Sequence, residues 1–192
     1  MATTAAFLAD VLQNRHNRTI LARLPKLGAP GARLVAGCLF QTVWNLQSQQ
    51  EPTASIKDYD LFYFDGSDLS WEAEDQVIRR ANALFADLPV TVEVRNQARV
   101  HLWYPERFGS DYPQLHRCED GIDRFLIRGT CVGIDADQQV YAPFGLDELY
   151  QGRLVRNTLL PDSSFPRFQA KAASYIERWP WLKVVEENSP QS

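Results

Sequence analysis

Two acidic residues stand at the start of a strongly β-forming segment, and their types and spacing suit metal chemistry. Residues 56–65 read IKDYDLFYFD, in which Asp58 and Asp60 lead into leucine, tyrosine and phenylalanine side chains that favour a buried strand. Because successive side chains of a strand alternate between its faces, the two carboxylates share one face, about 7 Å apart. Two like charges beside apolar surface repel each other, so the pair needs a positive partner.

A third carboxylate lies in a later segment that also alternates like a strand. In VTVEVRN, at 90–96, the inner valines occupy one face and Glu93 occupies the other. If the two strands are neighbours, Glu93 converges on Asp58 and Asp60, and three carboxylates suit Mg²⁺ (or Mn²⁺). Two such ions can activate an attacking hydroxyl and stabilise a departing pyrophosphate oxygen. We therefore predict metal-binding and catalytic roles for all three, against the alternative of solvated strand residues.

A phosphate site is indicated by VAGCLF, at 35–40, where Gly37 separates a short apolar run from a helical pattern. Glycine lets a phosphate approach the backbone, and the N-terminus of the following helix offers unpaired N–H groups. Gly37 and Cys38 are therefore candidate nucleotide-binding residues, although Gly37 could equally be a simple turn glycine. Arg95 shares the face of Glu93 and can bind phosphate through two hydrogen bonds, so it is a third candidate.

Hydrophobic periodicity and capping residues predict the elements that must position these side chains. In chain order they are one or two helices at about 3–24, a short strand or tight turn feeding a helix at 33–49, a strand at 57–64, a helix capped by Ser70, strands at 89–96 and 98–104, an extended pair within 124–144, a short helix at 146–152 and a helix at about 165–180. This order predicts an α+β (mixed α/β) fold, with a mixed β-sheet flanked by helices. We expect one domain over 1–188, with an N-terminal helical segment at 1–25, a core at about 32–160 and a disordered tail at 189–192.

The composition limits the class of protein. The 192 residues are 45% hydrophobic and 11% aromatic, which is enough for a sizeable core. A net charge of −4 argues against a sequence-independent nucleic-acid binder. Nucleic acid stays open as a partner, but no feature of the sequence indicates it. Neither a disulfide framework nor a zinc site is indicated by the scattered Cys38, Cys118 and Cys131. We expect neither a signal peptide nor a membrane span, and therefore a cytoplasmic protein without membrane contact.

The glycine turn, the helix, the D-x-D strand and the later acidic strand together resemble the polymerase-β-like nucleotidyltransferase superfamily. The segments AGCLFQTVWN, DYDLFYFD and VEVRNQARVHLWY are more closely similar to a family of small, mostly uncharacterised bacterial nucleotidyltransferases. RFLIRGTCVGI and VYAPFGLDELYQGRLVRN resemble the C-terminal part of that family, so the resemblance covers most of the chain. It implies a nucleotidyltransferase-like core in which Asp58 and Asp60 bind metal, Glu93 is the third carboxylate and Gly37 holds phosphate.

The chain departs from the superfamily pattern next to the glycine. Serine usually follows that glycine, whereas Cys38 stands here, and the gap from Gly37 to Asp58 is longer than in the minimal members. The third acid is often aspartate in the superfamily and is Glu93 here. Metal binding tolerates these changes, and backbone N–H groups can still supply most of the triphosphate contact.

The resemblance implies a metal-dependent nucleotidyltransferase that moves a nucleoside monophosphate from an NTP to a hydroxyl or amine and releases pyrophosphate. Its partners would be the NTP and an unidentified small-molecule or protein acceptor. Two alternatives stay open. One is a catalytically inactive nucleotide- or partner-binding module of the same fold, which Cys38 favours. The other is a metal phosphoesterase that uses the same three acids.

Overall fold

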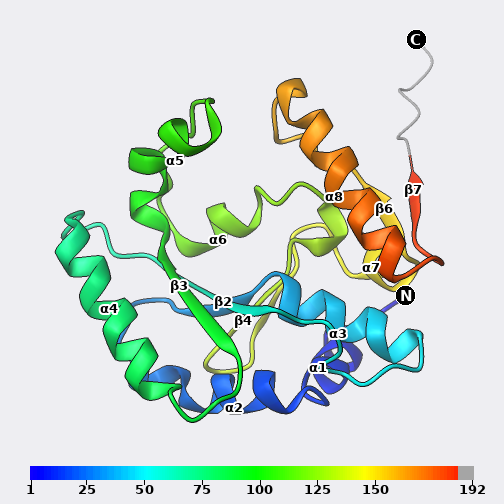
Figure 1. The fold of residues 1–192 in the computed structure, drawn as a ribbon, viewed down its shortest axis with the longest axis horizontal. Helices are drawn as coiled ribbons and strands as arrows, with labels where there is room; N and C mark the ends of the chain where they lie inside the picture. The colour runs from blue at the N-terminus through cyan, green and yellow to red at the C-terminus, as the bar shows by residue number, and fades with distance from the viewer. Residues whose placement is uncertain (186–192) are drawn as a thin grey trace.

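The computed structural model describes residues 1–185 and has a five-stranded mixed sheet at its centre (Figure 1). β2 and β3 run parallel, and the other neighbouring strands run antiparallel. The tail expected at 189–192 lies outside the described residues. The order across the sheet is β3 (Thr91–Asn96), β2 (Asp58–Tyr63), β1 (Arg33–Val35), β4 (Gly133–Asp135) and β5 (Val140–Tyr141).

Helices surround this sheet, and a second, two-stranded parallel sheet lies near the C-terminal helix (Figure 1). The α-helices are α1 (Thr4–Val11), α2 (Arg15–Arg23), α3 (Gly37–Gln47), α4 (Trp71–Leu84), α5 (Val100–Phe108), α6 (Cys118–Ile122), α7 (Asp147–Tyr150) and α8 (Phe165–Arg178). Short 3₁₀ turns are η1 (Leu24–Leu27), η2 (Gln97–Arg99), η3 (Arg128–Thr130) and η4 (Asp162–Ser164), and the second sheet pairs β6 (Arg153–Val155) with β7 (Lys183–Val185). The α+β prediction with a mixed, helix-flanked sheet is confirmed.

Local sequence signals set the ends of several elements. The Ser70 side chain accepts a hydrogen bond from the backbone N–H of Ala73, so it caps α4 as predicted. Glu72 and Glu74 lie in the first turn of α4, where the helix dipole favours negative charge. The short strand β1 feeds α3 through Ala36, which is the strand, turn and helix arrangement expected there.

Alternation along β2 separates the main core from the face that carries the acidic residues. Tyr59, Leu61 and Tyr63 are buried in the main core, together with residues of α1 to α4. Asp58 and Asp60 project from the opposite face because side chains alternate along a strand. A smaller apolar cluster, formed by Val35, Ile122 and Cys131 with Phe62 and Phe125 packed against it, lies apart from the main core.

The predicted strand over residues 98–104 is wrong, because the chain forms η2 and then α5 in this region. The Asn96 side chain accepts a hydrogen bond from the backbone N–H of Ala98, which begins the 3₁₀ turn directly after β3. β3 lies at the edge of the sheet, and within residues 1–185 no strand pairs with its outer side. The apolar residue Leu102 is 52% exposed, so the alternation of this segment does not reflect a buried sheet face.

Candidate active site

The parallel pairing of β2 and β3 brings the predicted carboxylates to one face of the sheet. Asp60 lies opposite Glu93 in the register, and Asp58 lies opposite Thr91. Residues in register on adjacent strands project to the same face, so Asp60 and Glu93 are neighbours there. The two strands are therefore neighbours and run parallel, which meets the condition for Glu93 to approach the two aspartates.

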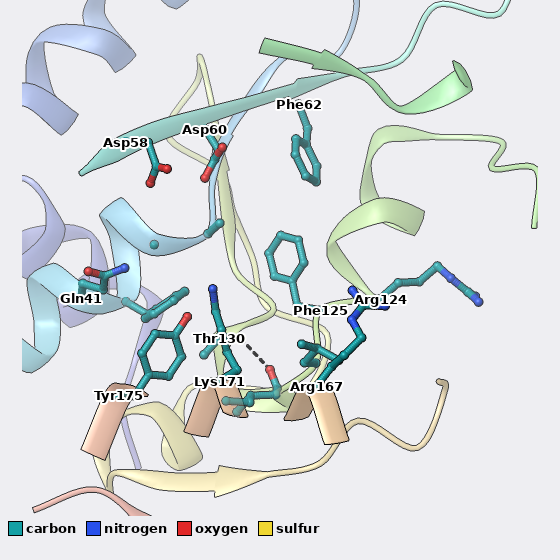
Figure 2. Close-up of a pocket in the computed structure, with 15 residues that line it drawn as sticks. Gln41, Asp58, Asp60, Phe62, Arg124, Phe125, Thr130, Arg167, Lys171 and Tyr175 are labelled. Carbon is teal, nitrogen blue, oxygen red and sulfur yellow. Dashed lines mark hydrogen bonds between the residues drawn. The ribbon is translucent and has the colours of Figure 1, made fainter. Parts of the chain in front are cut away.

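Asp58 and Asp60 line a cavity of about 350 Å³ between the sheet, α3 and α8 (Figure 2). The two carboxylates stand at one end, and Arg124 and Arg167 stand at the other (Figure 2). Phe62 and Phe125 contact each other edge to face between the two ends, with ring centroids 5.9 Å apart. The remaining lining residues are Ala36, Gly37, Phe40, Gln41, Leu126, Ile127, Thr130, Lys171 and Tyr175.

The N-terminus of α3 opens into this cavity through Ala36 and Gly37. No side chain caps the helix, so its first N–H groups are available to a ligand. Ala36 has φ 62° and ψ −135°, a left-handed conformation that alanine rarely adopts and that is typical of strained functional sites. A Cβ atom on Gly37 would lie 2.6 Å from Nε2 of Gln41, so any other residue here would displace the end of the Gln41 side chain.

Gln41 supplies a further polar group beside the helix N-terminus. Its Oε1 atom accepts a hydrogen bond of 3.0 Å from Arg178, which leaves Nε2 directed toward Gly37 and the cavity. Within residues 1–185, Nε2 of Gln41 has no hydrogen-bond acceptor of its own. It is therefore a donor that is held in place and remains free to bind an anion.

The carboxylates carry negative charge that the fold does not neutralise by contact. Burial and, to a smaller extent, the charges of Asp58 and Glu93 raise the pKa of Asp60 to about 7, against the opposing effects of Arg95 and Lys171. Neither Asp58 nor Asp60 makes a side-chain hydrogen bond or ion pair in the part of the chain that the structure describes. The two carboxylates therefore lack the positively charged partner that their sequence positions predict.

Glu93 and Arg95 contact each other rather than the cavity. Nη2 of Arg95 lies 3.2 Å from Oε2 of Glu93, and both side chains are partly exposed. Among residues 1–185, no three acidic, histidine or cysteine side chains come close enough to hold a metal ion together. The structure thus places Asp58 and Asp60 on the cavity wall and Glu93 beside them, paired with a cation. The donor chemistry of the two aspartates fits a hard divalent ion.

Cys38 does not present its thiol to the cavity. Its side chain is fully buried, and Sγ lies 3.3 Å from the backbone oxygen of Val35. Burial raises the pKa of the Cys38 thiol well above its usual value, and the charge of Asp60 adds to this effect. A protonated, enclosed thiol is a poor nucleophile, so any role of this residue in binding falls to its backbone N–H group.

Sequence reasoning missed the contribution of α8. Lys171 and Tyr175 point toward Asp58 and Asp60 across the cavity (Figure 2). The aromatic residues Phe168 and Tyr175 of this helix are buried in the main core. A signal was nevertheless present, because Arg167, Lys171 and Tyr175 follow one another at intervals of four residues and so share one face of the helix.

A family model described as nucleotidyltransferase matches residues 22–184, which is most of the chain. The chain belongs to this nucleotidyltransferase family. Membership makes the protein a transferase that acts on nucleotides, and it implies an NTP as substrate. The matched range includes the D-x-D strand, the turn at Gly37 and the cavity-lining face of α8. No curated protein matches the chain.

A solved structure supports the assignment of the fold. It was determined by NMR, and its title states that it reveals a CCA-adding enzyme head domain. The TM-score is 0.75 at 20% sequence identity, and the similarity covers 95% of this chain and 96% of the other. The nucleotidyltransferase-like core predicted from the sequence is therefore confirmed as a fold. None of the helices within residues 1–185 is long and apolar enough to span a membrane.

Proposed function

We propose that this nucleotidyltransferase moves a nucleoside monophosphate from an NTP to a hydroxyl or amine acceptor and releases pyrophosphate. The acceptor atom forms a bond to the α-phosphorus, and the bond from that phosphorus to the bridging oxygen breaks. The electron pair leaves with pyrophosphate, and the acceptor loses its proton. The observation that carries this proposal is the uncompensated Asp58 and Asp60 pair facing the uncapped N-terminus of α3 within one cavity.

Asp58 and Asp60 would hold a divalent ion, Mg²⁺ or Mn²⁺, as nucleotidyltransferases generally do. Such an ion, when bound, supplies positive charge beside the phosphates and stabilises the charge that develops on the departing oxygen. Glu93 would complete the carboxylate set if its side chain released Arg95 and turned toward the ion. In this arrangement Glu93 would also help to remove the proton of the acceptor.

The triphosphate would lie against the N-terminus of α3. The backbone N–H groups of Gly37 and Cys38 would donate to phosphate oxygens, as helix N-termini do for anions. Nε2 of Gln41 is a further donor at the same place, held by Arg178. Lys171 would add positive charge from the opposite wall. In the sequence prediction Arg95 also bound the nucleotide; its contact with Glu93 supports a role in positioning that carboxylate.

Catalysis in such a site rests on positioning and electrostatics rather than on a covalent intermediate. The buried Cys38 thiol supports this view, because it leaves the cavity without an accessible sulfur nucleophile from this residue. The aspartates and the helix N-terminus would hold the reacting phosphate between them. The acceptor would enter from the other end of the cavity, which Arg124 and Arg167 line.

Titration calorimetry with each of the four NTPs, with and without Mg²⁺, tests this proposal. We expect binding of at least one NTP that requires Mg²⁺ and that is lost in the double variant Asp58→Asn/Asp60→Asn. The matched control is Glu51→Gln/Asp137→Asn, which removes two exposed carboxylates from loops and should bind like the wild type. Affinity that does not depend on the metal would favour the inactive binding module, and the absence of binding to all four NTPs would contradict the proposal.

A further inference from the structure

A cluster of aromatic side chains lies at the outer end of the cavity, on α5 and the segment that follows it. The ring centroids of Tyr104 and Tyr112 are 4.3 Å apart, and those of Tyr104 and Phe108 are 4.5 Å apart. Trp103 extends the cluster, with its centroid 6.5 Å from that of Phe108. Phe108 is 42% exposed, which is unusual for so large an apolar side chain and marks a candidate contact surface.

Guanidinium groups stack against these rings. Arg167 lies 4.7 Å from the ring centroid of Phe108, and it also donates a hydrogen bond of 2.6 Å to the Tyr104 hydroxyl. Arg107 lies 5.4 Å from the centroid of Phe108, and Arg124 lies 5.1 Å from that of Tyr112. The contact between Arg167 and Tyr104 joins α8 to α5, so both helices contribute to one surface.

These cations are not neutralised by the protein. In the described part of the chain, Arg107, Arg124 and Arg167 have no carboxylate within ion-pair distance, and Lys171 has none either. Nε of Arg124 is also buried without a hydrogen-bond partner there. By contrast, arginines such as Arg33, in the central sheet, are paired with carboxylates. A group of unpaired cations held in place by aromatic rings is suited to a polyanion.

The unpaired cations are not confined to the cavity. Lys171, Arg167 and Arg124 line the cavity, whereas Arg107 is not among its lining residues and lies against the Phe108 ring. A ligand confined to the cavity would leave Arg107 without an anionic partner. The additional cations therefore indicate an anion with several phosphates spaced along a chain.

We propose that Trp103, Tyr104, Phe108 and Tyr112, together with Arg107, Arg124 and Arg167, form a docking surface for the acceptor, and that the acceptor is a single-stranded nucleic acid. A terminal hydroxyl of the strand enters the cavity from this side, toward Asp58 and Asp60. Bases stack on the aromatic rings and phosphates contact the arginines, which is how proteins bind single strands without sequence preference. This inference rests on the proposed function, because it names the class of acceptor for the same site.

The test is fluorescence anisotropy with a labelled single-stranded RNA of mixed sequence, measured on the full chain at several salt concentrations. We expect binding that weakens as salt increases, because phosphate contacts release counterions. The variant Arg107→Gln/Phe108→Leu alters two residues outside the cavity and should bind the RNA about tenfold more weakly or worse. The matched control Arg153→Gln/Trp71→Leu removes an exposed cation and an exposed ring elsewhere, and should bind like the wild type.

The outcomes separate this inference from the proposed function. Arg107→Gln/Phe108→Leu should keep metal-dependent NTP binding, whereas Asp58→Asn/Asp60→Asn should lose it and keep RNA binding. NTP binding without RNA binding would overturn the docking surface and leave the proposed function intact. RNA binding without NTP binding would overturn the proposed function and leave the RNA-binding surface intact. Equal competition by polyglutamate would also overturn the inference, since the surface would then recognise charge alone.

Discussion

Glu74 in α4 and Asp60 in β2 are two carboxylates that the fold largely withdraws from water, and their surroundings differ. Glu74 is 2% exposed, accepts a hydrogen bond of 2.8 Å from the backbone N–H of Asn96, and pairs with Arg99. Asp60 has no such contact among the described residues and lies beside two further carboxylates. A buried charge normally needs a partner that neutralises it. Glu74 has that partner within the chain, and Asp60 therefore depends on a partner from outside.

The two residues consequently differ in what they do for the protein. Glu74 and Arg99 join α4 to the turn after β3, so this ion pair holds the edge of the sheet in place. Asp60 destabilises the protein when it is ionised, and this cost is the reason why a bound cation would stabilise the folded state. Each of the four predictions below tests this difference, from the largest expected effect to the smallest.

The largest effect is expected at Glu74. Replacing it with glutamine leaves Arg99 buried without its counter-charge, so Glu74→Gln should lower the free energy of unfolding by about 3 kcal/mol. Urea denaturation followed by circular dichroism measures this change. Glu72→Gln, at an exposed position in the same helical turn, is the control and should change stability by less than about 0.5 kcal/mol.

Asp60→Asn should have the opposite effect in metal-free protein at pH 8. The folded-state pKa of about 7 exceeds the ordinary value of 3.8, so the folded protein binds this proton more tightly than the unfolded chain. The contribution of Asp60 to stability is therefore fully present below pH 3.8 and is lost as the pH rises through 7. The variant avoids this loss, so at pH 8 it should be more stable than the wild type by about 1 to 2 kcal/mol. This value is smaller than the full pKa shift implies, because Asp60 is partly exposed to solvent in the cavity.

The difference between variant and wild type should shrink as the pH falls toward 4. Urea denaturation in the presence of a chelator, at pH 4.5, 6 and 8, measures it. An Asp60→Asn protein that is less stable than the wild type at all three values would mean that Asp60 is a structural carboxylate like Glu74.

Mg²⁺ should stabilise the wild type by about 1.4 kcal/mol when its concentration is ten times the dissociation constant. The gain should disappear in Asp58→Asn/Asp60→Asn and persist in Glu51→Gln/Asp137→Asn. Thermal denaturation with and without the ion provides the comparison. An equal gain in all three proteins would indicate a general effect of salt rather than binding at the aspartates.

The smallest effects are expected from the neighbours of Asp60. The charge of Glu93 raises the pKa of Asp60 and that of Arg95 lowers it, so Glu93→Gln should lower this pKa and Arg95→Gln should raise it. Carbon-detected NMR of the Asp60 carboxyl group measures both shifts. Shifts in the same direction for the two variants would contradict the electrostatic coupling described here.

Local sequence patterns predicted much of what positions the carboxylates. Alternation in DYDLFYF placed Asp58 and Asp60 on one face of a strand, and Ser70 marked the start of α4, because both signals act between residues close in sequence. The segment at 98–104 also alternates, but a helix forms there. The hydrogen bond between the Asn96 side chain and the N–H of Ala98 turns the chain here despite the alternation. This bond forms because Asn96 is the last residue of β3.

The other wall of the cavity could not be predicted in this way. Lys171 and Tyr175 come within reach of the aspartates only because α8 packs across the molecule, more than 100 residues further along the chain. The contact of Glu93 with Arg95 is different, because the two residues share one face of the same strand and their pairing is local in sequence. Only the packing of α8 is decided by tertiary contacts that a single sequence does not encode locally.

The most direct test is an NMR titration of the Asp60 carboxyl group, first in metal-free protein and then with Mg²⁺ and a non-hydrolysable NTP. We expect a pKa near 7 without the metal and a value that falls when the ion and nucleotide bind. A pKa near the ordinary 3.8 in the metal-free protein, or a raised pKa that Mg²⁺ leaves unchanged, would contradict the view that Asp60 depends on an external cation.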